Sequence, residues 1–337
     1  MNRLQLRRGS RGLSLIELMI AMGISVVMTL ALGTFMLQGT RSGREDINIS
    51  SMLDELGYAA ALLSLDLEMA GFWAQVHDPS AIELDGTLAL GGTDCGPAGW
   101  YRDLAPLALL DNNTGASGVQ PLTGYPCLDA DDVMPGTDVI AIKRVQGRVA
   151  GTDTVTSGMQ TGLIYLRTHD KFGRMYLHGG TPGTVETPYR NWQYAPAVYY
   201  VQRWSVSDTE SPLIPSLCRM VLRANGGTPE FVRECVARGV ENLQLEIGVD
   251  SDEDGSANYF TPSPEPTDLR RASTARLYLQ VRSTRPDFHY LNEKTYQIGN
   301  TELPYTPGGD EAHYYRKTLS TEVALRNPRA LQGVAIQ

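Results

Sequence analysis

The chain has 337 residues, of which 42% are hydrophobic and 20% are charged, which is enough for one large domain or two ordinary ones. Its 34 Gly and 19 Pro follow no period, which excludes collagen and favours a body rich in loops and strands. A formal net charge of −9 disfavours broad binding to phosphate backbones, so no nucleic-acid partner is expected. Four cysteines without C-x-x-C spacing argue against a zinc ribbon or a thioredoxin-like centre.

The N-terminus consists of a basic leader followed by a long apolar run. The leader, residues 1–12, carries four arginines and no acid, and residues 13–38 are apolar apart from small polar residues and Glu17. As a helix this run would reach about 39 Å, enough to cross a hydrocarbon core of about 30 Å. It is too long for a secretory signal, and no A-x-A-like site follows it. An ordinary membrane anchor would leave the cost of burying the carboxylate of Glu17 unexplained.

Residues 12–19 (GLSLIELM) resemble the class III signal of type IV prepilins and pseudopilins. The resemblance implies that a prepilin peptidase cuts after Gly12, that Leu13 becomes the N-methylated first residue, and that Glu17 is the assembly glutamate of that family. Phe is the commonest residue of the family at the position of Leu13. A carboxylate five residues from a free amine cannot easily fold back along a helix to reach it. We therefore expect Glu17 to pair with the amine of a neighbouring subunit and to set the register between the two.

Four segments follow from this pattern. The leader (1–12) is expected to be removed, residues 13–40 to form a transmembrane and assembly helix, and residues 41–72 to form an amphipathic helix. The arginines keep the N-terminus in the cytoplasm, which places residues 73–337 in the periplasm as a β-rich globular domain. The helix is predicted to run to about Ala70 and to stop at Gly71. Its apolar residues recur at three- and four-residue steps, while charged residues, Asp66 among them, occupy the other positions.

Beyond the helix the clearest strand signals are residues 139–142, 163–166 and 197–206, and the C-terminal third alternates over 243–249, 277–281 and 319–325. Residues 76–193 are rich in turns. This order predicts an α+β fold, in which a long helix packs on an antiparallel sheet with a loop-rich insertion. Residues 62–73, 239–250 and 321–327 also resemble minor pilins of the PilW type, which implies a type IV pilin-like fold.

The same resemblance implies a function. It indicates a minor pilin of the bacterial inner membrane that spans it once, enters the pilus fibre and helps to prime its assembly, supporting twitching motility or adhesion. The implied partners are prepilin peptidase, other minor pilins, the major pilin, the inner-membrane assembly platform and a tip adhesin. A minor pseudopilin of a type II secretion system is the alternative. Arg270-Arg271 is too small a basic patch to predict a DNA-uptake pilin. No catalytic motif occurs, so no enzyme is expected.

The cysteines fit an oxidising compartment, in which an even number favours disulfides. Cys95, Cys127, Cys218 and Cys235 allow three pairings. A two-residue turn at residues 226–227 would set Cys218 opposite Cys235 and leave Cys95 for Cys127. Pro229, which lies in the second strand of that hairpin, leaves the register open.

One acidic cluster, Asp250, Asp252 and Asp254 followed by Gly255, matches the first half of a calcium loop. The second half does not match. Position twelve is Thr261 rather than Glu, and only Asn258 falls at a ligand position. A solvated acidic turn is the favoured interpretation, and a weak calcium site is the alternative. No other cofactor is expected.

Overall fold

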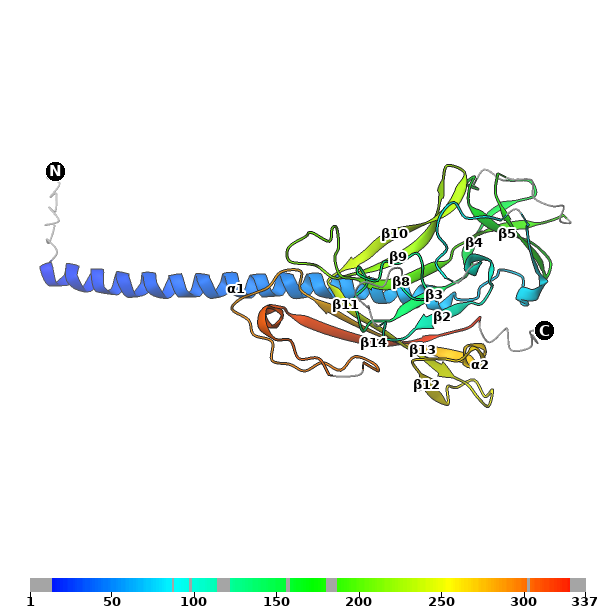
Figure 1. Cartoon of the computed structure of the whole chain (residues 1–337). Helices are drawn as coiled ribbons and strands as arrows, with labels where there is room; N and C mark the ends of the chain where they lie inside the picture. Colours follow the sequence, from blue (N-terminus) through cyan, green and yellow to red (C-terminus); the bar gives the residue numbers. More distant parts are fainter. Residues whose placement is uncertain are drawn as a thin grey trace, which may run out of the picture. The chain divides into compact units, whose positions relative to one another are not determined.

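The computed structural model describes residues 14–86, 88–96, 99–113, 122–155, 158–179, 187–301 and 304–327. The chain divides into two compact units, Met1–Ser50 and Ser51–Gln337, which are described separately below. One helix of 54 residues, α1 (Leu15–Glu68), contributes to both units (Figure 1). The strands all belong to the second unit.

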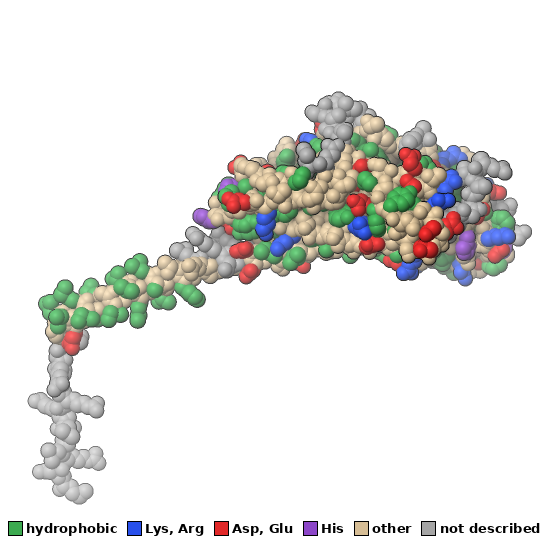
Figure 2. Space-filling model, turned by 90° about the horizontal axis from the view of Figure 1, so that it is seen from below, with side chains coloured by type: hydrophobic (Ala, Val, Ile, Leu, Met, Phe, Trp, Pro, Cys, Tyr) green, Lys and Arg blue, Asp and Glu red, His purple; other side chains and the backbone are tan. Residues whose placement is uncertain are grey.

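The described part of the first unit is helical from Leu15, and its segment Leu15–Met36 carries exposed apolar side chains. The large hydrophobic residues between Leu15 and Met36 are exposed, and Figure 2 shows hydrophobic side chains along the visible face of this part of the helix. Three hydroxyl groups in this stretch donate hydrogen bonds to carbonyl oxygens one turn earlier, at 2.7 to 2.8 Å: those of Ser25, Thr29 and Thr34. Because the helix itself satisfies these hydroxyls, they do not interrupt its apolar surface.

In the second unit one face of α1 is buried against strands. The buried residues recur at three- and four-residue steps and are at most 8% exposed: Met52, Leu56, Ala59, Ala60, Leu63 and Leu67. The helix ends at Glu68, two residues before the expected position, and a turn leads to Gly71. Gly71 has a φ of +72°, and a Cβ atom there would lie 2.9 Å from Cβ of Pro106. Glycine is therefore required at the point where the chain leaves the helix.

Fourteen strands in the described residues form three sheets instead of the one sheet that was predicted. The first has the order β1-β6-β5-β7-β4 and comprises β1 (Ile82–Leu84), β4 (Val145–Thr152), β5 (Ile164–His169), β6 (Phe172–Leu177) and β7 (Arg190–Tyr194). The second has the order β10-β9-β8-β3-β2 and comprises β2 (Leu107–Leu110), β3 (Val139–Ile142), β8 (Ala197–Gln202), β9 (Ser216–Asn225) and β10 (Thr228–Arg238).

The third sheet has the order β12-β11-β13-β14 and comprises β11 (Val240–Val249), β12 (Tyr259–Thr261), β13 (Ala272–Arg282) and β14 (Arg316–Ala324). A short helix, α2 (Pro266–Arg270), precedes β13, and 3₁₀ turns lie at Pro79–Ala81, Trp100–Arg102 and Gly309–His313. Strand pairing is antiparallel except between β1 and β6, which are parallel. A long helix with a mostly β domain of largely antiparallel sheets agrees with the predicted α+β class.

The second sheet is buried on both of its faces. In β3, Ile140 and Ile142 belong to the hydrophobic core that includes α1, β11 and β13. Val139 and Ala141, which point the other way, belong to a second core with residues of the first sheet. Burial on both faces explains why this strand is a continuous apolar run without polar alternation.

Candidate functional site

The predicted cleavage site, Gly12 and Leu13, lies outside the described residues. Glu17 lies in the first turn of α1, where the N-terminal end of the helix dipole favours a negative charge. Its Oε2 atom accepts a hydrogen bond from the backbone N–H of Ser14 at 2.9 Å. Among the described residues the carboxylate thus has a local hydrogen-bond partner, the backbone of Ser14. Its pairing with the amine of a neighbouring subunit stays a prediction.

The segment after Ser14 has the length and composition of a membrane span. Residues Leu15–Met36 have a mean hydropathy of 2.3, and none of the segment is buried within the structure. Its 22 residues match the roughly 20 that cross a bilayer as a helix. Glu17 is the one charged residue among them. An apolar helix that follows a basic leader supports the interpretation that the chain is anchored in a membrane.

Two disulfides occur in the second unit, Cys95–Cys127 and Cys218–Cys235. The second joins β9 to β10 in the register that the sequence suggested, because Asn225 pairs with Thr228 across the turn and Cys218 pairs with Cys235. Pro229 does not shift this register. It lies on β10, which is an edge strand, and an edge strand tolerates a residue that lacks an N–H group.

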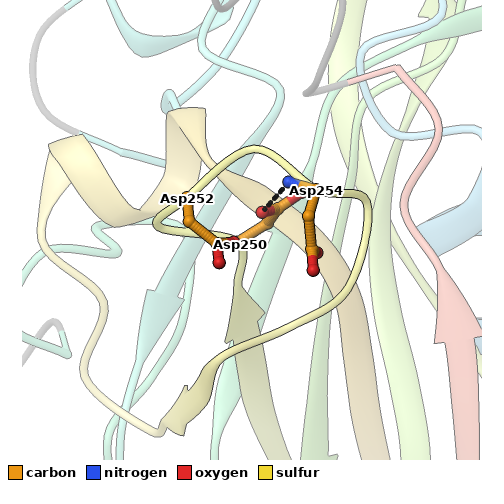
Figure 3. Close-up of side chains that lie close together, drawn as sticks. All are labelled: Asp250, Asp252 and Asp254. Atoms are coloured by element: carbon orange, nitrogen blue, oxygen red, sulfur yellow. Dashed lines mark hydrogen bonds between the residues drawn. The ribbon is translucent and has the colours of Figure 1, made fainter.

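The acidic turn between β11 and β12 brings three carboxylates together (Figure 3). One oxygen from each of Asp250, Asp252 and Asp254 lies within 4.8 Å of the others. Asp250 is fully buried, and its two oxygens accept hydrogen bonds from the backbone N–H groups of Asp254 and Gly255 at 3.1 and 2.9 Å. Asp252 and Asp254 are exposed. The loop is therefore organised around the Asp250 side chain by its own backbone.

The rest of the turn adds no further carboxylate at the expected ligand positions. The Oδ1 atom of Asn258 accepts hydrogen bonds from the backbone N–H and hydroxyl of Ser251, at 2.6 and 2.9 Å. Thr261 lies on β12, paired with Ile247. The cluster has the hard oxygen donors that calcium prefers, but calcium binding stays a prediction.

The structure also brings together a charged group that the sequence pattern did not indicate. Asp66 was expected on the polar side of the helix, yet it is 2% exposed. Its carboxylate accepts hydrogen bonds from Arg144 and from the hydroxyl of Tyr199, at 2.6 and 2.5 Å. Burial, and secondly the Asp66 carboxylate, raise the pKa of Tyr199, so its hydroxyl stays protonated and donates. Arg144 is 78 positions away along the chain, and helical periodicity contains no signal for such a partner.

Comparisons with known proteins match both ends of the chain. The family described as Type IV Pilus-assembly protein W matches residues 198–327, which run from β8 to just beyond β14. The Prokaryotic N-terminal methylation motif matches residues 7–33, which include Gly12, Leu13 and Glu17. No curated protein and no solved structure matches the chain. The two family matches together support the assignment of this chain as a type IV pilin of the PilW type.

Proposed function

We propose that this chain is a minor pilin that is cleaved between Gly12 and Leu13, methylated at Leu13 and incorporated through α1 into a type IV pilus. The observation that carries the proposal is the place of Glu17. It lies five residues after Gly12 and within an otherwise uncharged segment, Leu15–Met36, whose large side chains are exposed. Such a surface requires lipid before assembly and other helices afterwards.

Glu17 would act as the register contact during assembly. Hydrogen bonding to Ser14 uses Oε2, which leaves Oε1 available to the methylated amine of a neighbouring subunit. In a medium of low dielectric an unpaired carboxylate is costly, so an axial position that pairs it is strongly preferred over positions that do not. Removal of the four leader arginines would also change the formal net charge from −9 to −13 and release the N-terminus from the cytoplasmic face.

The second unit would then lie in the periplasm before assembly and on the fibre afterwards. Its two disulfides suit the oxidising side of the inner membrane. The proposed partners are prepilin peptidase, the other minor pilins, the major pilin, the inner-membrane platform and a tip adhesin. Priming of assembly by such a complex would support twitching motility or adhesion.

The test combines mass spectrometry of the mature N-terminus with analysis of a sheared pilus fraction. We expect a chain that begins at Leu13, carries one added methyl group and is present in that fraction. A Gly12→Trp variant should keep its leader, because the bulky side chain blocks cleavage, whereas Gly12→Ala should still be cleaved in part. A processed Gly12→Trp protein would refute the cleavage assignment. Loss of type II secretion with normal piliation on deletion of the gene would favour a pseudopilin instead.

A further inference from the structure

β14 is an edge strand of the third sheet, and its outer side carries unpaired main-chain groups. The N–H of Leu325 donates to the carbonyl of Ser273, so the odd-numbered residues of β14 bond to β13. The even-numbered residues point outward, because main-chain groups alternate along an antiparallel ladder. The outward N–H and C=O groups of Thr318, Ser320 and Glu322 have no hydrogen-bond partner among the described residues, and all three residues are exposed. This edge is therefore open to another strand.

The other edge strands of the described sheets carry features that prevent such pairing. Three of them are short, since β1 and β12 have three residues each and β2 has four. The register of β4 shifts twice. β10 contains Pro229 and shifts register between Cys235 and Ala237, and the carbonyl of Pro229 is occupied by the N–H of Gly91. Among these edge strands only β14, with nine residues, is long, free of proline and glycine, and regular in register.

The side chains along this edge define the chemistry of a matching strand. Leu319 and Thr321 lie on the side of β14 that faces the core formed with α1, yet both are only partly buried. A strand beside them would cover this side with apolar residues at alternate positions. Lys317 and Glu322 are exposed near the two ends of the open stretch. They favour an acidic residue at one end of the incoming strand and a basic residue at the other.

A second copy of this chain does not fit the edge. Within the second unit β14 runs along the direction of α1, and Asn327, just after β14, donates to the carbonyl of Glu68 at the helix end at 3.2 Å (Figure 1). An antiparallel pair of two β14 strands would turn the two helices in opposite directions, which chains anchored in one membrane do not adopt. A parallel pair would place Lys317 beside Lys317 and Glu322 beside Glu322, and these like charges repel.

We propose that β14 pairs with a strand of a different pilus subunit, which runs antiparallel to β14 and extends the third sheet. The inference rests on the proposed function, because it names a contact made within the assembled complex. The incoming strand carries apolar residues on the side of Leu319, polar residues on the side of Ser320, a basic residue near Glu322 and an acidic residue near Lys317. Its direction follows the other pairs of this sheet, which are all antiparallel. Main-chain hydrogen bonds supply affinity in such pairing, and alternate side chains supply specificity.

The first test places proline at Ser320, whose N–H points outward. Ser320→Pro removes this donor and leaves the hydrogen bonds to β13 intact, whereas the control Ser320→Val keeps the N–H and changes only the side chain. Immunoblots of sheared pili measure the incorporation of each full-length chain, and thermal unfolding of the purified chain confirms that it is folded. We expect Ser320→Pro to lower incorporation about tenfold and Ser320→Val to leave it unchanged. Normal incorporation of folded Ser320→Pro, or an equal loss in Ser320→Val, overturns the proposal.

Photo-crosslinking tests the contact independently of pilus yield. Benzoylphenylalanine replaces Thr318 or Glu322 in living cells, and mass spectrometry locates each crosslink in the membrane and pilus fractions. The same probe at Arg190, which is exposed on β7 of the first sheet, is the control. We expect the probes at 318 and 322 to attach to one segment of a single different protein. The probe at 322 should react nearer to the N-terminus of that segment, because the strands are antiparallel. Ser320→Pro should abolish both crosslinks.

The two tests separate this contact from the proposed function. Absence of the natural chain from sheared pili refutes the proposed function, and the crosslinks in the membrane fraction then decide on the edge by themselves. Crosslinks to a second copy, crosslinks to residues 328–337 of the same chain, equal yields from the probe at 190, or no crosslinks from 318 and 322 overturn the pairing. If the natural chain is nevertheless present in pili, the proposed function stands without this contact.

Discussion

Asp66 and Arg144 form an ion pair that joins α1 to the chain directly after the buried strand β3. Nη2 and Nε of Arg144 lie 2.6 and 3.1 Å from the same oxygen of Asp66, whose side chain is 3% exposed. Both charges are largely removed from water, so each depends on the other for stabilisation. The pair therefore holds the helix at one position relative to β3 in the second sheet.

Removal of one partner should be strongly destabilising. Asp66→Asn would leave the Arg144 guanidinium without its counter-charge, and we expect a loss of roughly 3 kcal/mol in the free energy of unfolding. Chemical denaturation measures the change. Asp54→Asn is the matched control, because Asp54 lies on the exposed side of the same helix and should change stability by less than about 0.5 kcal/mol. Equal effects of the two substitutions would show that the ion pair adds no stability.

A second prediction concerns pH and the buried Lys143. Its Nζ atom lies 3.2 Å from Asp103 and 4.3 Å from the centre of the Trp100 ring. Burial lowers the pKa of Lys143 to about 8, although the Asp103 carboxylate opposes this shift. The folded chain thus releases this proton at a lower pH than the unfolded chain, so this group's contribution to stability rises between about pH 8 and pH 10.5.

We expect this contribution to rise by about 2 kcal/mol between pH 7.5 and pH 9.5. The measurement is the difference in unfolding free energy between the natural chain and Lys143→Met at each pH, because the subtraction removes other titrating groups. The upper limit of pH 9.5 avoids ionisation of tyrosines. A difference that stays constant or falls with pH would contradict the prediction.

The Cys218–Cys235 disulfide should contribute measurably to stability. The cysteines are separated by 17 positions, and a bridge across a loop of this size is worth about 3 kcal/mol. Replacing both with alanine avoids a free thiol and should lower the free energy of unfolding by about that amount. Peptide mapping without reductant should recover Cys218 linked to Cys235 and Cys95 linked to Cys127. Alkylation of all four thiols in exported protein would contradict the pairing.

Calcium binding at the acidic turn is testable by thermal unfolding. If an ion is held by Asp250, Asp252 and Asp254, the chain should unfold at a higher temperature in millimolar calcium than in a chelator, because the ion offsets their mutual repulsion. Asp252→Ala should abolish the difference. Asp208→Ala, which alters an exposed carboxylate elsewhere, should preserve it. An unchanged unfolding temperature in the natural chain would leave the solvated turn as the correct interpretation.

The last prediction separates processing from assembly. Glu17→Ala should be cleaved at Gly12 and retained in the membrane, because the peptidase signal precedes it and removal of a carboxylate eases insertion. Its incorporation into pili, and surface piliation with it, should fall because the register contact is lost. Thr34→Ala is the control, because the Thr34 hydroxyl donates its hydrogen bond to the carbonyl oxygen of Ala31 in the same helix. Immunoblots of membrane and sheared pilus fractions provide the measurement. Normal incorporation of the Glu17→Ala protein would indicate that the apolar segment serves only as a membrane anchor.

The sequence predicted the elements that depend on short local patterns of residues, such as a helix end, an alternating strand or a tight turn. The left-handed residue Gly71 ends the helical region as expected, and the alternation in residues 243–249 and 277–281 corresponds to β11 and β13. The hairpin register followed from the position of two glycines. These features depend on the conformational preferences of a few adjacent residues.

Features that depend on distant partners were not predictable in the same way. The first sheet lies in a turn-rich region, and its strand β4 contains two glycines and no regular alternation. The burial of Asp66 requires Arg144 and Tyr199, which are distant from it in the sequence. The spacing of residues along one element contains no information about such contacts.

The hydroxyl groups of Ser25, Thr29 and Thr34 turn inward onto the backbone of their own helix. Small polar residues often hold neighbouring membrane helices together through hydrogen bonds, but here each hydroxyl already donates its proton. Helices that pack on this stretch in the proposed fibre would therefore be guided mainly by the shapes of their apolar side chains. If the proposed contact forms, specific alignment of one subunit against the next would then depend on Glu17. In such a fibre the apolar helices could slide past one another under tension and return. The charged contacts at Glu17 would keep the axial register between neighbouring subunits.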